Sequence, residues 1–224
     1  MRSTAFAAAG LCLLALSCST VRQIRPLAKG ESSAAISVGG PIAEVGKTYI
    51  PLPLISVGYN YGLVEKLDVE AGVNLLSALY GIAQIDAGVN WRLWIAHGFI
   101  PGLIVSPKLF LLTNFTPASL RVYPDVQLAG CWEPWKYRYV YCGLDNWIEY
   151  HEVRDDGNPQ TNHWLPAPFV GISLGNRQWQ AQCEAKWYVP NLVNDTRAVS
   201  NIGIGSYGAL GIMVGVNRAF GGGK

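Results

Sequence analysis

The chain has 224 residues and a net charge of +2 at pH 7, and only 14% of its residues are charged although 50% are hydrophobic. Soluble domains carry about 25% charged residues, so this composition favours a protein with much of its surface in lipid. The small net charge and the absence of any block of like charges give no reason to expect a nucleic-acid partner.

The N-terminus has the pattern of an export signal. Met1-Arg2 supplies a positive end, and Ala5 to Leu16 form a twelve-residue apolar run, which is shorter than the roughly 20 residues that cross a bilayer. Ala15-Leu16-Ser17-Cys18 then resembles the lipobox of bacterial lipoproteins, in which the Cys is lipidated and becomes the new N-terminus. The resemblance implies lipidation of Cys18. The residue after it is Ser19 and not Asp, which resembles lipoproteins that are sorted to the outer membrane. Ordinary signal cleavage near Ser17 is the alternative.

After a polar stretch up to residue 32, the hydrophobic pattern has the period of two that is typical of β-strands. Residues 67–75, 84–93 and 178–187 alternate throughout; in the last run, Trp179, Ala181 and Cys183 alternate with Gln180, Gln182 and Glu184. Weaker alternation fills the gaps. The predicted strands are 33–45, 49–61, 67–76, 83–94, 102–112, 119–130, 136–148, 164–175, 178–189 and 203–218. Their length suits a tilted strand crossing a bilayer, which needs about 9–11 residues.

The connections between these strands alternate between short and long. Asn176-Arg177 is a hairpin-sized turn, whereas residues 149–163 and 190–202 are the longest connections. This alternation is typical of outer-membrane barrels. An even number of strands places both barrel ends on the short-turn side, which is also where a lipid on Cys18 would lie. Tryptophans near the strand ends predict two aromatic girdles, formed by Trp94, Trp132, Trp135 and Trp179 at the short turns and by Trp147, Trp164 and Trp187 at the loops.

We therefore predict an all-β fold, an antiparallel up-and-down transmembrane β-barrel of about ten strands within a range of eight to twelve. The chain resembles small bacterial outer-membrane barrels over residues 33–220, and its last strand resembles the C-terminal strand of such proteins, although four residues follow Phe220. The predicted organisation is a signal peptide over 1–17, a lipidated tether over 18–32, the barrel over 33–220 and a tail over 221–224.

The polar faces of the strands carry acidic and basic residues in nearly equal number. A barrel of this size has a narrow interior that side chains can fill. We therefore expect a lumen filled by ion pairs, and a narrow polar pore remains the alternative. The candidate lumen residues are Asp68, Glu70, Asp86, Arg92, Lys108, Arg121, Asp125, Glu184 and Lys186.

The most polar stretch contains His151, Glu152, Asp155, Asp156 and His163. Its spacing matches neither an EF-hand nor a zincin motif, so we interpret it as a surface loop without a metal. Outer-membrane lipid A deacylases pair a His with a Ser on the barrel wall, and no predicted strand has a His and a Ser two residues apart. Since phosphate loops and nucleophile elbows are also absent from the sequence, we expect no catalytic residue and no cofactor.

The favoured function is an integral outer-membrane barrel lipoprotein with a structural or small-solute pore role. Its expected partners are outer-membrane lipids and the machineries for barrel assembly and lipoprotein sorting. The alternative is a lipid-anchored soluble periplasmic barrel that binds an apolar ligand, as lipocalins do, with its apolar face turned inward. An outer-membrane lipid-modifying enzyme is less favoured.

Overall fold

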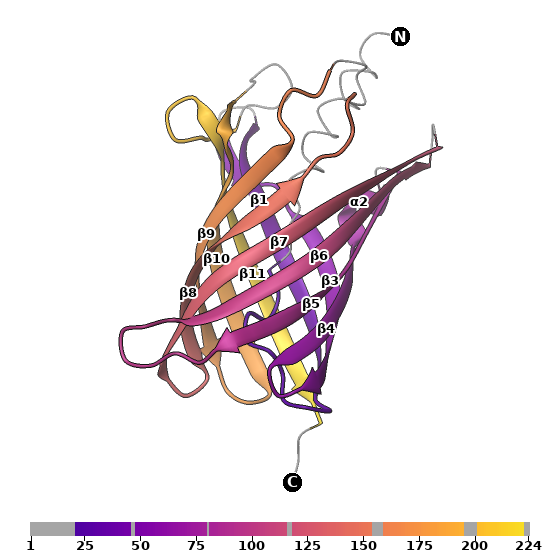
Figure 1. The fold of residues 1–224 in the computed structure, drawn as a ribbon. Helices are drawn as coiled ribbons and strands as arrows, with labels where there is room; N and C mark the ends of the chain where they lie inside the picture. Colours follow the sequence, from indigo (N-terminus) through magenta and orange to yellow (C-terminus); the bar gives the residue numbers. More distant parts are fainter. Residues whose placement is uncertain are drawn as a thin grey trace.

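The computed structural model describes residues 21–45, 48–79, 81–115, 118–153, 159–194 and 201–221. They form eleven strands and one short helix (Figure 1). The elements are β1 (Ser32–Val45), β2 (Thr48–Pro51), β3 (Leu54–Val64), β4 (Leu67–Asn74), α2 (Leu75–Leu79), β5 (Ile82–Trp94), β6 (Gly102–Phe115), β7 (Ala118–Trp135), β8 (Arg138–Ile148), β9 (Trp164–Gly175), β10 (Trp179–Val193) and β11 (Tyr207–Phe220).

Ten of these strands close into a barrel. Each of β3 to β10 pairs antiparallel with the next strand in the chain, β1 pairs with β3, and β11 returns to pair with β1. The closing seam runs from Ser32 opposite Phe220 to Pro41 opposite Gly211. The structure therefore confirms the predicted up-and-down antiparallel barrel and its strand number.

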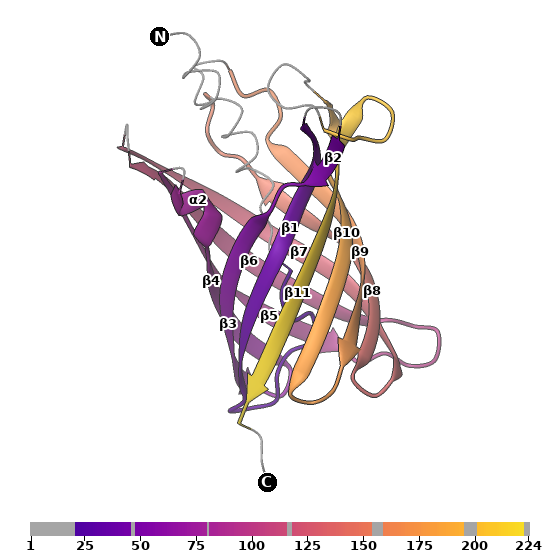
Figure 2. The same ribbon diagram turned by 180° about the vertical axis from the view of Figure 1, so that it is seen from behind.

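One predicted strand, 49–61, is instead two. Residues 52–53 separate β2 from β3, and Pro53 has no N–H to donate to a ladder. β2 pairs only with the last residues of β1, from Ile42 opposite Pro51 to Val45 opposite Thr48. The resulting hairpin leaves the barrel wall at the loop end (Figure 2).

The two ends of the barrel differ. β1 begins and β11 ends at the same end, since Ser32 lies opposite Phe220. The same end carries the short turns, such as those between Val64 and Leu67 and between Gly175 and Trp179. The other end carries α2 and the two longest connections. The start of β1 and the end of β11 therefore lie at the short-turn end, as the even strand count predicted.

The two faces of the wall have opposite polarity. Along β10, Gln180, Gln182 and Glu184 are buried inside, while Ala181 and Cys183 are exposed outside. Large apolar side chains form an exposed ring on the outer surface, and small residues of β10 complete it. The ring includes Ile36, Tyr59, Val73, Ile85, Leu109, Leu128, Val140, Val170 and Val214, one from each of the other barrel strands.

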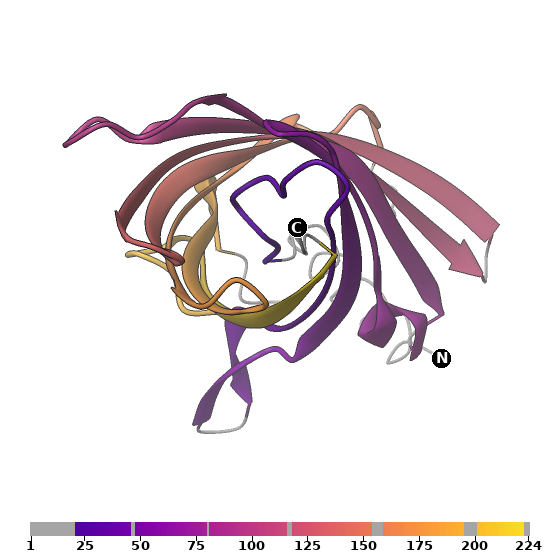
Figure 3. The ribbon, with the colours of Figure 1, turned by 90° about the horizontal axis from the view of Figure 1, so that it is seen from below.

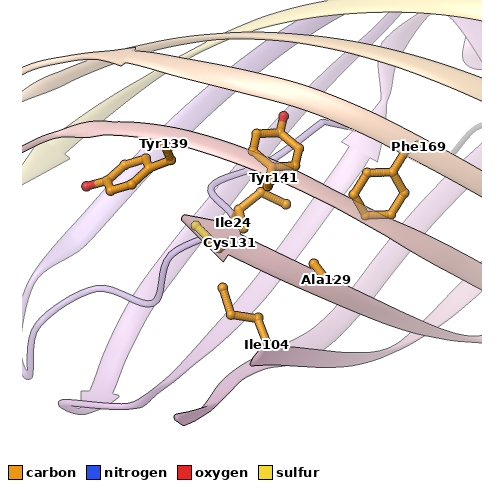
Figure 4. Close-up of a cluster of buried hydrophobic side chains, with 7 residues drawn as sticks. All are labelled: Ile24, Ile104, Ala129, Cys131, Tyr139, Tyr141 and Phe169. Atoms are coloured by element: carbon orange, nitrogen blue, oxygen red, sulfur yellow. The ribbon is translucent and has the colours of Figure 1, made fainter. Parts of the chain in front are cut away.

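Apolar side chains inside the barrel gather in two clusters. The first combines Ile24, which precedes β1, with wall residues that include Ile104, Tyr141 and Phe169 (Figure 4). The second lies toward the loop end, where Trp147 stacks on Phe110 with ring centroids 4.2 Å apart. The prediction that Trp147 belongs to an outer girdle is wrong, because its position on β8 faces inward and its ring is buried in this cluster.

Candidate functional site

The segment that precedes β1 lies inside the barrel. We call residues 21–31 the lumen segment; the sequence had predicted a tether there. Seen from the short-turn end, the segment forms a loop within the ring of strands (Figure 3). Val21, Ile24 and Leu27 are all buried. Cys18 and the rest of the predicted tether lie outside the described residues.

Arg22 is the strongest contact between the lumen segment and the wall. Its guanidinium makes a two-pronged ion pair with Asp86, with both N–O distances 2.5 Å, and its Nη1 lies 3.9 Å from Glu70 Oε2. All three side chains are almost completely buried. Nη2 donates a charge-assisted hydrogen bond to Asp86 Oδ2, and the contact between Nη1 and Oδ1 is an ion pair.

A floor of bare backbone lies beneath the guanidinium. Gly58 on β3 pairs with Gly72 on β4, and Gly72 pairs with Asp86 on β5, so the three positions form one row across the wall. A Cβ atom at either glycine would overlap the guanidinium of Arg22. The two glycines and the two carboxylates Asp86 and Glu70 together form what we call the guanidinium slot.

The neighbouring row explains a second ion pair. Glu70, Gly88 and Lys108 lie in register on β4, β5 and β6. The Lys108 side chain crosses Gly88, where a Cβ would clash with its Cγ, and its Nζ reaches Glu70 Oε1 at 2.8 Å. The missing side chain at Gly88 therefore allows charges two strands apart to pair.

Wall side chains also satisfy the backbone of the lumen segment. Asn90 Nδ2 donates to the carbonyl oxygens of Gln23 and Ile24, at 3.1 and 3.0 Å. The N–H of Leu27 donates to Asp68 Oδ2 at 3.1 Å. Buried backbone groups need such partners, so hydrogen bonds with β4 and β5 hold the segment in a defined position.

A second charged group lies between β7, β8 and β10. Lys186 Nζ is 2.6 Å from Asp145 Oδ2 and 3.1 Å from Glu184 Oε1, and all three side chains are at most 2% exposed. Gln127 donates to the other oxygen of Asp145 at 2.8 Å. Asp125 accepts a hydrogen bond from the N–H of Asn146 at 2.9 Å.

Acids outnumber bases in the described lumen wall. Six buried carboxylates of the strands face only two lysines, which leaves four formal negative charges in excess. The lumen segment supplies a third buried cation, Arg22. The carboxylates are Asp68, Glu70, Asp86, Asp125, Asp145 and Glu184, and the lysines are Lys108 and Lys186.

Two of the nine residues predicted for the lumen lie at its ends. Arg92 is at the short-turn end, where it donates to the carbonyl oxygen of Glu65. Arg121 is at the loop end, where it donates to the carbonyl oxygen of Val153 and lies 3.8 Å from Glu149. The other seven face the lumen: Asp68, Glu70, Asp86, Lys108, Asp125, Glu184 and Lys186.

Sequence reasoning missed the partners that the neighbouring elements supply. Arg22 was missed because its segment looked like a tether. Asp145 could have been found, since it shares its phase on β8 with Trp147, but its strand mixes polar and apolar residues on both faces. Asn90 was visible only as a polar position, because the carbonyl groups that it binds belong to a distant segment.

The predicted surface loop is attached to the mouth of the barrel by its two histidines. Glu149 is buried, and its Oε1 is 2.6 Å from His151 Nδ1. His163 Nδ1 lies 2.7 Å from the carbonyl oxygen of Glu149. Glu152 is exposed, and Asp155 and Asp156 lie outside the described residues. Both histidines are therefore placed where they fix the base of the loop.

Within the described residues, no group of three or more His, Cys, Asp or Glu side chains is placed to hold a metal ion. The described helix is too short to cross a membrane.

A closed antiparallel barrel with charges inside and apolar side chains outside is the architecture of outer-membrane β-barrel proteins, and the chain has this fold. Solved structures of similar fold include OprG from Pseudomonas aeruginosa, with 10% identity over 89% of this chain and 100% of that one and a TM-score of 0.34. The NalP autotransporter translocator domain from Neisseria meningitidis has 11% identity over 98% of both chains and a TM-score of 0.48.

A third similar structure is Ail, the attachment invasion locus protein of Yersinia pestis, with 12% identity, 86% of this chain and 99% of that one covered, and a TM-score of 0.29. No family model matches the sequence, and no curated protein matches it either.

The variant Lys186→Met tests the buried ion group. It leaves Asp145 and Glu184 buried without their cation, so the free energy of unfolding should fall by about 3–5 kcal/mol. Urea unfolding in phospholipid vesicles measures the change. Adding Asp145→Asn to this variant should restore part of the lost free energy of unfolding, because one of the two unpaired carboxylates is removed.

Arg177→Met is the control, since it removes a cation from an exposed pair with Glu31 and should cost less than about 1 kcal/mol. Equal losses in Lys186→Met and Arg177→Met would contradict the importance of the buried group.

Proposed function

We propose that the chain is an integral barrel of a bacterial outer membrane, anchored in addition by a lipid on Cys18. In this proposal it is a non-enzymatic, narrow pore for small solutes, and the lumen segment closes it. The short turns and both barrel ends face the periplasm. The partners are outer-membrane lipids and the machineries that assemble barrels and sort lipoproteins.

The inverted polarity of the wall carries this proposal. Val170, Ile36 and Ile85 are each more than half exposed on the outer surface, whereas Asp68 and Asp145 are fully buried inside. In water this arrangement forgoes about 25 cal/mol for every Å² of apolar surface left exposed, and lipid removes that cost. The soluble lipocalin-like alternative needs the apolar face inside, and this lumen holds carboxylates and lysines there.

The way in which the lumen is filled favours a closable pore over a purely structural barrel. The short-turn end is occupied by a segment that belongs to no strand and is covalently continuous with the wall at β1. Its withdrawal would break its contacts with Asp86, Asn90 and Asp68 and its backbone hydrogen bonds with Gly62 of β3, but no pairing between strands. A permanent filling would more simply use side chains of the wall itself.

Lipidation and closure are linked by chain length. Val21 lies against Gly215, which stands five residues before the end of β11 and thus about 17 Å along the strand from the barrel end. The three residue steps from Cys18 to Val21 span at most about 11 Å. Barrel strands tilt by about 35–45°, so the depth of Val21 along the barrel axis is about 12–14 Å, close to this reach. A lipid on Cys18 that enters the membrane at the short-turn end would therefore hold the chain before Val21 nearly extended.

Two substitutions of the same kind test membrane integration. Val170 and Val64 are exposed to a similar degree, 54% and 50%, but Val170 lies in the middle of β9 and Val64 at the end of β3. An Arg at the bilayer midplane costs about 2–4 kcal/mol, and near the interface about 0–1 kcal/mol. Val170→Arg should therefore destabilise the barrel in vesicles far more than Val64→Arg. A soluble barrel would tolerate both changes equally.

Metabolic labelling with a fatty-acid analogue tests the lipid anchor. The wild-type protein should be labelled and Cys18→Ser should not, because the thiol of Cys18 is the proposed attachment atom. The other cysteines serve as internal controls, so a Cys183→Ser variant should keep its label. Unchanged labelling of Cys18→Ser would contradict lipidation at this residue.

Conductance in planar bilayers tests the closable pore. Deleting residues 21–29 should raise the single-channel conductance several-fold, because it removes the chain that fills the short-turn end. The open channel should prefer cations, since the wall carries excess carboxylates. Arg25→Gln is the control, because the pair of Arg25 with Glu133 is partly exposed and the segment stays seated. A deletion variant that conducts no better than the wild type would indicate a structural barrel.

A further inference from the structure

We propose that the guanidinium slot recognises the guanidinium group of a solute in the lumen, and that Arg22 occupies this slot as an internal competitor. The slot consists of Gly58, Gly72, Asp86 and Glu70. This inference rests on the proposed pore and names the class of solute that it would take, a small cation with a planar guanidinium end.

The shape of the slot points to a planar, forked cation. The backbone of two glycines on adjacent strands gives a flat floor, and a Cβ at either position would occupy the space of the guanidinium. Asp86 stands at the end of the same row and meets both outer nitrogens of Arg22. An ammonium group is a compact point charge that needs neither a flat floor nor a two-pronged carboxylate.

The surroundings of the slot offer more acceptors than Arg22 uses. Asn60 Oδ1 and Asp68 Oδ1 are buried and accept no hydrogen bond from the residues that the structure describes. Asn60 pairs with Glu70, in the row next to that of the two glycines, and two residues along a strand correspond to about 7 Å. A four-carbon chain covers such a distance, so a second positive group on the solute could reach this row.

The charge of the lumen favours the same class of solute. The strands carry six buried carboxylates and two lysines, and Arg22 is the cation that the chain itself brings to Asp86. A low-dielectric tube lined by excess negative charge concentrates cations. A cationic solute that displaces Arg22 would replace one guanidinium by another, so the buried carboxylate keeps a partner throughout.

Binding of agmatine, which has a guanidinium and an amine joined by four carbons, tests the proposal. Isothermal titration is performed on the full chain in detergent micelles. Because the wild-type slot is occupied, Arg22→Gln should bind agmatine with a Kd at least tenfold lower than the wild type. Arg25→Gln, which changes an arginine of the same segment outside the slot, should match the wild type. Adding Asp86→Asn to Arg22→Gln should abolish the gain.

A diamine of similar length, 1,5-diaminopentane, separates the slot from a merely acidic lumen. Arg22→Gln should bind it at least tenfold more weakly than agmatine, because the diamine lacks the planar fork. Equal binding of the two compounds, or no gain in Arg22→Gln, would overturn the proposal. Unheated gel mobility reports whether each variant is folded. If Arg22→Gln does not fold, Arg22→Lys takes its place, because it keeps the charge but not the fork. Arg22→Lys should then bind agmatine with a lower Kd than the wild type does.

The micelle experiment needs neither membrane insertion nor conductance. Failure of the pore proposal would therefore appear as agmatine binding without a conducting channel. Failure of the slot would appear as a cation-selective conductance in the deletion variant with no preference for agmatine over the diamine.

Discussion

Closure of the barrel through hydrogen bonds between β1 and β11 is the constraint on which the rest of the structure depends. It removes every free edge from the wall and fixes the width of the lumen. Because side chains alternate along a strand, closure also forces every second residue into this confined space. The charged residues of the polar faces must then find partners inside this space, and Glu70 and Lys108 do so within one row set by the register.

Glycines determine where those partners can meet. At Gly88 the absent side chain lets Lys108 cross a strand to Glu70, and at Gly58 and Gly72 it lets a guanidinium lie on the backbone beside Asp86. Carboxylates alone would give an acidic tube with little discrimination. The combination of carboxylates and bare backbone gives one place in the tube a defined shape, and shape is what distinguishes a guanidinium from other cations.

The lumen segment connects the barrel wall to the N-terminal part of the chain. It satisfies buried polar groups of the wall and in return fills the short-turn end of the barrel. It also follows Cys18, the proposed lipidation site, which precedes Val21 by three residues. In the proposed pore this segment is the part that moves, because it belongs to no strand.

The sequence by itself determined the barrel. Strict alternation in residues 67–75, 84–93 and 178–187 predicted both the strands and their polar faces, because a period of two follows from strand geometry alone. Seven of the nine predicted lumen residues face the lumen for the same reason. Only the tertiary structure decided which of them meet. The register brings Gly58, Gly72 and Asp86 into one row, and the fold returns Arg22 to that row across 64 positions of the chain. Such contacts depend on closure of the whole ring, and no local pattern in the sequence records them.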